Sequence, residues 1–561
     1  MMRRPLLLAV CGLVAVSGGA RGAVQSPGAD IILINGNIIT VDAVFSRVEA
    51  AAIRAGRFIA VGRSADVRKH GGRRTALIDL RGRTVVPGLA DNHLHGAGGG
   101  PGVDLSRARS LAEVTAAIAH RVTQAAPGQI VVTNRDWHEG QLKEQRLPLR
   151  RDLDAVSPRT PVVVVRGGHE YILNSAALQR WKIDERTPEP PGGRISRYAD
   201  GTLNGELVDR AKNLVPLDEI VPPLLSPRTR DARITDKVAE YDRLHAAGLT
   251  SVRHPGISLE EYRLLLEMKQ RGLLTMRVRV LLTPTALSGL QQGEGDEWLR
   301  IDGVKLGVDG GFEGGWMREA YEEPYGEGGT YRGLQTLPLD SFTAQVRALH
   351  RDGWRVFTHA VGDAAIDQVL TAYEAADADK PISGQRWGIE HAFIARPDHL
   401  PRMTRLGLAV AAQHHLYLAA PSLVKYWGAA RAARTTPMRM FIDAGLPVSS
   451  GTDAPVVPYP PLWTIYHFVT RGTISAGVLD AGQGITRAEA LRASTMGNAW
   501  LGFEEDARGS IEVGKAADLV VLSDDIMTCP EKRIEQMDVL LTMVGGRVVY
   551  RDPAISMASV R

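Results

Sequence analysis

The stretch Val85-Val-Pro-Gly-Leu-Ala-Asp-Asn-His-Leu-His-Gly96 places two histidines, His93 and His95, at the end of an apolar run. Side chains alternate across a strand with a period of two residues, so both imidazoles point the same way. Two ligands of one metal ion need that arrangement. Taken alone, the pair is equally consistent with two surface histidines in a loop. The rest of the sequence has to decide between a metal site and a surface loop.

Four further apolar runs also end in polar residues. They are Val304-Lys305-Leu306 with Asp309 after it, Val356-Phe-Thr-His359, Trp387-Gly-Ile-Glu-His391 and Pro447-Val-Ser-Ser-Gly-Thr-Asp453. Each run is typical of a buried parallel strand, and each is followed by a helical pattern. The carboxyl ends of such strands are where a (β/α)8 barrel gathers its chemistry.

The spacing of these residues supports an α/β fold with a (β/α)8 TIM barrel. His359 and His391 are 32 residues apart, about one strand–helix unit. His391 and Asp453 are 62 residues apart, which leaves room for one more strand, and Leu408-Ala-Val-Ala-Ala-Gln413 fills that gap. The pattern therefore assigns strands one, four, five, six and eight to His93 with His95, Lys305, His359, His391 and Asp453.

Lys305 stands where the fourth strand is expected to supply a metal ligand. An ammonium group would repel metal cations, so the lysine has to be neutral or carry added CO2 as a carbamate. A carbamate has two oxygens that can bridge two ions about 3.5–4 Å apart. We expect the carbamate; the alternative is an ordinary lysine in a salt bridge.

The sequence pattern at both ends of the chain predicts β structure. Residues 29–86 contain short alternating runs with a tight turn at Asn35-Gly36, and residues 507–552 have a similar pattern. We therefore expect one small β-sandwich built from both ends, flanking a metal-dependent barrel at 87–505. Segment 100–225 is longer than one strand–helix unit needs, and we expect it to be an insertion over the barrel mouth.

Residues 1–20 predict a cleaved export signal. A basic start, Met-Met-Arg-Arg-Pro, precedes a short apolar run from Leu6 to Val16 and small residues at Gly18 and Ala20. The protein is then periplasmic or secreted. Removing this segment lowers the net charge from +4 to +2, and no cluster of Lys and Arg indicates nucleic-acid binding. No other apolar run is long enough to predict a membrane span.

The order of these motifs resembles the amidohydrolase superfamily, and within it the amidohydrolase 3 branch. That branch includes exported metal-dependent hydrolases similar to N-substituted formamide deformylases. The resemblance covers nearly the whole chain after the signal. It rests on Pro87–His95, Leu153-Asp-Ala-Val-Ser-Pro158, Gly168-His169, Asn174-Ser-Ala-Ala-Leu178, Val304–Gly310, Glu323-Pro-Tyr325, His359-Ala-Val-Gly-Asp363, Ile389-Glu-His391, Gly509–Leu522 and Val544–Tyr550.

The resemblance implies a catalytic centre with two divalent metal ions, which we expect to be zinc. His93 and His95 would hold the more buried ion, His359 and His391 the more exposed one, and a carboxylated Lys305 would join them. Asp453 would bind the buried ion and move protons. From its position at a strand end, and not from the resemblance, we expect His169 to donate a hydrogen bond to the substrate carbonyl; its alternative role is that of a turn histidine capping the backbone.

The implied activity is hydrolysis of carbon–nitrogen bonds other than peptide bonds, in small N-acyl or N-formyl compounds, by a metal-bound hydroxide. The alternatives are a deaminase with one ion, a lactone or cyclic amide hydrolase, and a binding protein that has lost turnover. A small-molecule substrate and a homodimer fit the resemblance. Two departures from the branch pattern concern substrate preference: Asp209 stands where Glu is usual, and His254 where an acidic residue is commoner.

Overall fold

The computed structural model describes residues 28–220, 229–322, 328–457, 459–555 and 557–559. The predicted export signal at 1–20 and the Glu323-Pro-Tyr325 motif lie outside these residues. The described chain contains a closed barrel and three further β-sheets.

The central sheet is an eight-stranded parallel barrel, as the sequence predicts. The first and last strands close it, because Asn92 N donates to Ser450 O at 3.1 Å and Leu94 pairs in parallel with Ala454. Its strands are β8 (Leu89–Asp91), β14 (Leu249–Ile257), β15 (Arg277–Leu282), β16 (Leu299–Gly307), β17 (Val356–Ala360), β18 (Gly388–His391), β19 (Ala409–Gln413) and β20 (Val448–Gly451).

Helices follow most barrel strands and pack apolar faces against them. In α9 (Asp363–Asp379), Ile366, Val369, Leu370 and Tyr373 are fully buried, as their helical spacing predicts. The connection from β15 to β16 has only a short 3-10 turn, Pro284–Ala286. The other helices around the barrel are α6 (Arg230–Ala246), α7 (Leu259–Gln270), α8 (Leu339–Arg351), α10 (Leu400–Arg405), α11 (Leu416–Trp427), α12 (Ala429–Ala433), α13 (Met438–Asp443), α14 (Pro461–Thr470), α15 (Arg487–Ala493) and α16 (Met496–Leu501).

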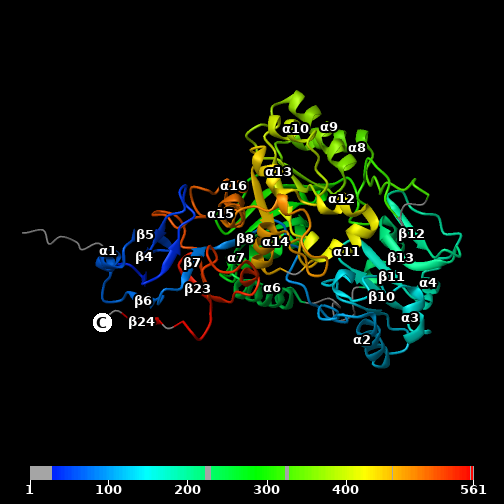
Figure 1. Cartoon of the computed structure of the whole chain (residues 1–561), viewed down its shortest axis with the longest axis horizontal. Coiled ribbons are helices and arrows are strands. Elements are labelled where there is room, and N and C mark those ends of the chain that lie inside the picture. The colour runs from blue at the N-terminus through cyan, green and yellow to red at the C-terminus, as the bar shows by residue number, and fades with distance from the viewer. Residues whose placement is uncertain (1–27, 221–228, 323–327, 458, 556, 560–561) are drawn as a thin grey trace, which may run out of the picture.

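Two sheets made from both chain ends form a sandwich at one end of the molecule (Figure 1). The turn at Asn35-Gly36 carries the chain from one sheet to the other, so its two flanking strands are not a hairpin pair. One sheet has β1 (Ile31–Ile34), β4 (Ala50–Arg54), β5 (Arg57–Gly62), β6 (Ala76–Asp79) and β24 (Met557–Ser559); the other has β2 (Asn37–Ile39), β3 (Arg47–Val48), β7 (Thr84–Pro87), β21 (Leu519–Leu522), β22 (Val539–Val544) and β23 (Arg547–Arg551).

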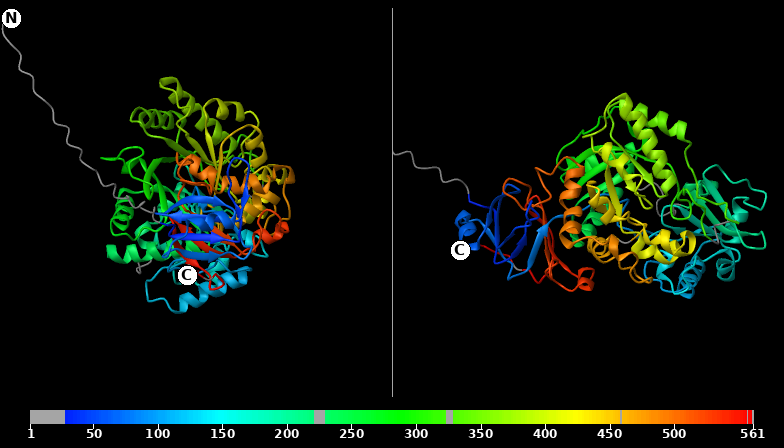
Figure 2. Two further views of the ribbon diagram at one scale, coloured as in Figure 1. Left: turned by 90° about the vertical axis from the view of Figure 1, so that its left-hand side faces the viewer. Right: turned by 45° about the horizontal axis from the view of Figure 1, so that its top comes forward.

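The fourth sheet lies at the opposite end of the molecule, beyond the barrel (Figures 1 and 2). It is inserted between the first and second barrel strands, and the loop between β10 and β11 enters the barrel mouth. Its elements are β9 (Val131–Val132), β10 (Val162–Arg166), β11 (Glu170–Leu173), β12 (Gly193–Arg197) and β13 (Leu203–Asp209), with α2 (Leu111–Thr123), α3 (Arg150–Val156), α4 (Ser175–Arg180) and α5 (Leu217–Ile220).

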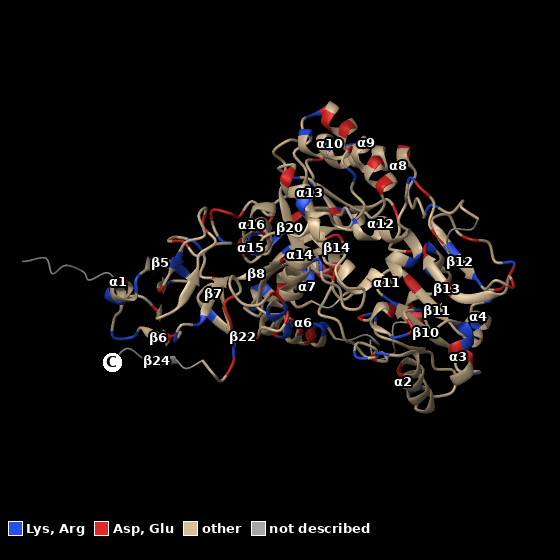
Figure 3. Ribbon diagram, in the orientation of Figure 1, with Lys and Arg blue, Asp and Glu red and all other residues tan. Residues whose placement is uncertain are grey.

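Charged residues of both signs are interspersed along the ribbon (Figure 3), in keeping with a net charge of only +4. None of the helices in the described ranges combines the length and apolar character needed to cross a bilayer.

Candidate metal centre

The residues predicted from the strand ends converge at the carboxyl end of the barrel. A small cavity there is bounded on one side by barrel residues and on the other by the loop that follows β10. Its lining is Arg166, Gly167, Gly168, His169, Gly311, Phe312, His359, Val361, His391, Phe393, His415, Asp453 and Val456.

One group of possible ligands comes from the first and last strands. Asp453 Oδ1 lies 3.4 Å from His93 Nε2 and 3.3 Å from His95 Nε2. The three donor atoms are all within 4.8 Å of one another. Asp453 Oδ1 is buried and has no hydrogen-bond partner among the described residues, so it is free to bind a cation.

A second group shares the same carboxylate. His391, His415 and Asp453 also bring their donor atoms within 4.8 Å of one another, with His415 Nε2 3.1 Å from Asp453 Oδ2. The ring of His359 is 4.6 Å from that of His391, but its Nε2 faces Gly310 O at 3.0 Å. His359 therefore has only Nδ1 left for a ligand. His415 lies two residues after Gln413, the last residue of the seventh barrel strand, β19. The sequence analysis did not select it, although its position just after a strand end could have identified it as a candidate ligand.

The exposure of the four predicted histidines does not divide them into a buried pair and an exposed pair. The side chains of His93 and His391 are both buried, that of His359 is 12% exposed, and that of His95 is 38% exposed.

Two histidines are oriented by partners that the sequence analysis did not single out. His93 Nδ1 lies 2.5 Å from Glu390 Oε2, and His391 Nδ1 lies 2.7 Å from Gln413 Oε1. Because these oxygens are acceptors, each ring carries its proton on Nδ1 and presents Nε2 as a free ligand atom. A charged residue within an apolar barrel strand, as Glu390 is in β18, was the available signal.

Lys305 lies beside the first group. Its Nζ is 3.4 Å from His93 Nε2, and the described residues give it no ion pair. Burial lowers the pKa of Lys305 and so favours the neutral amine. The salt-bridged lysine that the sequence left open is therefore not the arrangement seen among the described residues.

The surroundings give the ring nitrogens and the carboxylate the protonation states that metal binding requires. Burial lowers the pKa of His359 to about 3 and holds those of His93 and His391 well below the usual range. Burial acts to raise the pKa of Asp453, but the nearby His93 and the hydrogen bond from His415 outweigh it, so the pKa is well below normal. Neutral imidazoles beside an ionised carboxylate fit a divalent metal such as zinc.

His169 lines the cavity from the inserted sheet, where its ring stacks on His359 at 5.4 Å. Its Nδ1 lies 2.5 Å from Oδ1 of Asp209, the residue that departs from the branch pattern. A Cβ atom at Gly310 or Gly314 would collide with Asp209 Oδ2, so these glycines allow the carboxylate to fit. His169 is thus held by a side chain, and Nε2 is left for a substrate.

Arg166 is the only Arg or Lys among the described residues that line the cavity. Its guanidinium bonds both oxygens of Glu139, at 2.9 and 2.8 Å, and both of Glu313, at 3.2 and 2.5 Å. Glu170 lies 3.3 Å away as a third carboxylate. The positive charge of Arg166 is therefore already compensated within the protein.

His254, the second departure from the branch pattern, is not part of the centre. Its Nδ1 lies 2.6 Å from Leu94 O, and its Nε2 lies 3.3 Å from the hydroxyl of Tyr241. The residue supports the backbone between His93 and His95.

An eight-stranded α/β barrel with histidines, a lysine and an aspartate at its strand ends defines a metal-dependent hydrolase. The chain belongs to the amidohydrolase family, whose sequence model matches residues 76–550. It is accordingly a hydrolase of carbon–nitrogen bonds other than peptide bonds.

Individual relatives cover almost the whole chain. An N-substituted formamide deformylase of Arthrobacter pascens is 31% identical over 93% of this chain and 98% of its own length. An uncharacterized metal-dependent hydrolase from Pyrococcus furiosus has a TM-score of 0.63 at 26% identity, over 89% of this chain and all of that one. One from Pyrococcus horikoshii has a TM-score of 0.66 at 24% identity, over 90% of this chain and 99% of that one.

His169→Ala is expected to lower kcat/KM for an amide substrate by about 10²-fold while metal content stays the same, because it removes a hydrogen-bond donor to the acyl oxygen. Asp209→Asn should give a smaller loss, since the amide can still hold the ring. Steady-state kinetics and metal analysis of both variants check this, with His120→Ala on the exposed face of α2 as the control. A kcat/KM unchanged in His169→Ala would remove His169 from the site.

Proposed function

We propose that the protein is an exported enzyme with two zinc ions that hydrolyses small N-formyl or N-acyl amines, N-substituted formamides first among them. The convergence of His93, His95, Lys305, His391 and Asp453 on one another at the carboxyl end of the barrel carries the proposal. The printed name of the Arthrobacter pascens relative supports the choice of substrate.

In the mechanism that we propose, the metal activates the water and the substrate carbonyl, and the protein's own residues move the proton and orient the substrate. When bound, the metal lowers the pKa of water and polarises the scissile carbonyl. Asp453 accepts the proton of the attacking water and delivers it to the leaving nitrogen, which its ionised state permits. Asp209 holds the ring of His169 through Nδ1, which directs Nε2 toward the acyl oxygen.

Because the positive charge of Arg166 is already paired within the protein, the cavity favours uncharged substrates. A carboxylate on the substrate would need a cation in the cavity, and the guanidinium there is already bound by Glu139 and Glu313. The wall formed by Phe312, Val361 and Phe393 is apolar. We therefore infer that N-formyl and N-acyl amines are preferred over N-acyl amino acids.

A screen of N-substituted formamides, N-acyl amines, N-acyl amino acids, lactones and cyclic amides tests this function. We expect turnover of uncharged amides, its loss after dialysis against a chelator, and its recovery with Zn²⁺. Metal analysis of the active protein should give two ions per chain, whereas one ion with release of ammonia would indicate the deaminase. Lactone turnover without amide turnover would also contradict the proposal.

We further propose that Lys305 is carboxylated and bridges the two ions. The neutral amine adds CO2 and loses a proton to give the carbamate, and burial of Lys305 favours that neutral form.

Lys305→Ala should bind at most one ion and lose activity by about 10²-fold or more, with partial recovery by added acetate. A Lys305→Ala variant that keeps two ions, or a wild-type protein without a carbamate signal in ¹³C NMR after ¹³C-bicarbonate loading, would contradict this. Lys425→Ala, on α11, is the control.

We also propose that the protein is exported and that it forms a homodimer. The basic start and apolar run of residues 1–20 support cleavage of an export signal. N-terminal sequencing of the mature protein from the periplasm or medium should begin near Arg21, and a chain that keeps Met1 inside the cell would contradict it. We propose a homodimer by analogy with related barrels, which light scattering tests.

A further inference from the structure

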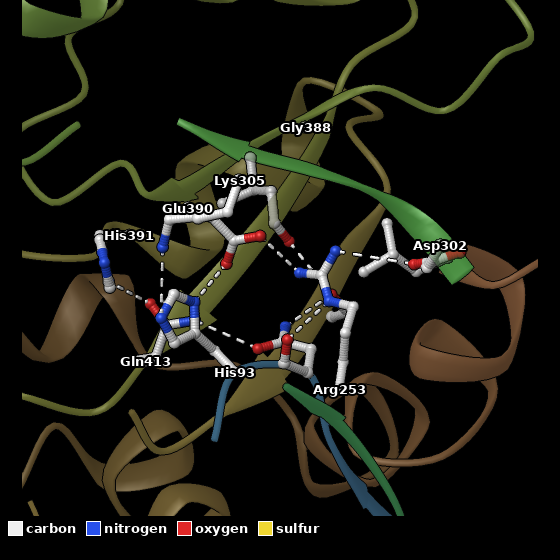
Figure 4. Close-up of polar contacts among 12 residues, drawn as sticks. His93, Arg253, Asp302, Lys305, Gly388, Glu390, His391 and Gln413 are labelled. Atoms are coloured by element: carbon white, nitrogen blue, oxygen red, sulfur yellow. Dashed lines mark hydrogen bonds and ion pairs between the residues drawn. The ribbon is translucent and has the colours of Figure 1, made fainter. Parts of the chain in front are cut away.

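Glu390 connects His93, a predicted metal ligand, to Arg253 (Figure 4). One oxygen, Oε2, lies 2.5 Å from His93 Nδ1; the other, Oε1, accepts from an Arg253 terminal nitrogen at 2.6 Å. The carboxylate is fully buried. Both of its oxygens are therefore used, and neither faces the substrate cavity.

Arg253 also holds the backbone next to His93. Its Nε donates to the carbonyl oxygen of Asn92 at 2.7 Å, and its guanidinium lies over the ring of Phe357 at 4.3 Å. Asp302 Oδ2 is 3.9 Å from its remaining nitrogen. Arg253 thus fixes the residue that precedes His93, and through Glu390 it fixes the imidazole ring itself.

We propose that Glu390 and Arg253 are positioning residues that set the metal affinity of His93, and hence of the His93, His95 and Asp453 group. The inference rests on the proposed function. Glu390 accepts Nδ1–H, which keeps Nε2 as the free nitrogen facing Asp453 and Lys305. A charged acceptor also makes the imidazole a stronger ligand, and such partners change metal affinity by about 10- to 100-fold.

His391 provides an internal comparison. Its Nδ1 is held by the neutral amide of Gln413, so an amide is enough to orient a ring in this barrel. The buried Glu390–Arg253 pair is costly to desolvate, and orientation alone does not require it. The negative charge of Glu390 therefore serves to make His93 a stronger metal ligand.

Zinc affinity of the metal-free chain tests the proposal without a substrate. In Glu390→Gln, the Zn²⁺ Kd at one of the two sites should rise by about 10-fold or more, as measured by competition with a chromophoric chelator. Glu504→Gln is the matched control, because Glu504 is also buried in a pair with an arginine, Arg279, but contacts none of the predicted ligands. Its Kd should stay within about twofold of wild type.

The double variant Glu390→Gln with Arg253→Met separates affinity from stability. Glu390→Gln alone leaves Arg253 without its main partner and should lower the Tm of the metal-free protein. Removing both charges should recover much of that Tm while Kd stays raised about 10-fold. A Kd near wild type in Glu390→Gln, or its full recovery in the double variant, would overturn the proposal. Zinc binding with these values but no amide hydrolysis would instead refute the proposed function alone.

Discussion

Closure of the barrel is the constraint on which the metal centre depends. The segments that close it are 89–95 and 448–454, and Asp453 N donates to His93 O at 2.6 Å while His95 N donates to Ala454 O at 2.8 Å. These bonds are part of the pairing between the first and last strands. The backbone bonds that close the sheet therefore also bring His93 and His95 next to Asp453, although the two segments are far apart in the sequence.

The position of the buried charges follows from the same geometry. A parallel barrel has a closed interior, and any ionised group inside it must be paired there. Glu390 is paired with Arg253 and contacts the predicted ligand His93, whereas Arg166 is paired with Glu139 and Glu313 at the edge of the cavity. The protein thus surrounds the reacting atoms with charges whose orientation is already fixed.

The barrel and the convergence of the strand-end residues could be predicted from the sequence, because periodicity and spacing assign each residue to a strand end. Roles that depend on a neighbour in space could not. Gln413 and Glu390 were visible in predicted strands, but nothing in the sequence indicates that they hold His391 and His93. The Asn35-Gly36 turn was predicted as a turn, yet its two strands join different sheets, since their pairing depends on residues far along the chain. Arg166 has a role set by Glu139 and Glu313, which are separated from it in sequence but not in space.

The close fit of Asp209 against Gly310 and Gly314 has a consequence for how this protein can change. A longer carboxylate at position 209 would need room that the loop after β16 does not offer, and a side chain at either glycine would displace the carboxylate that holds His169. The three positions are therefore expected to be epistatic. Laboratory evolution of this pocket would have to alter the inserted sheet and the barrel loop together, and libraries that vary one position at a time would miss those combinations.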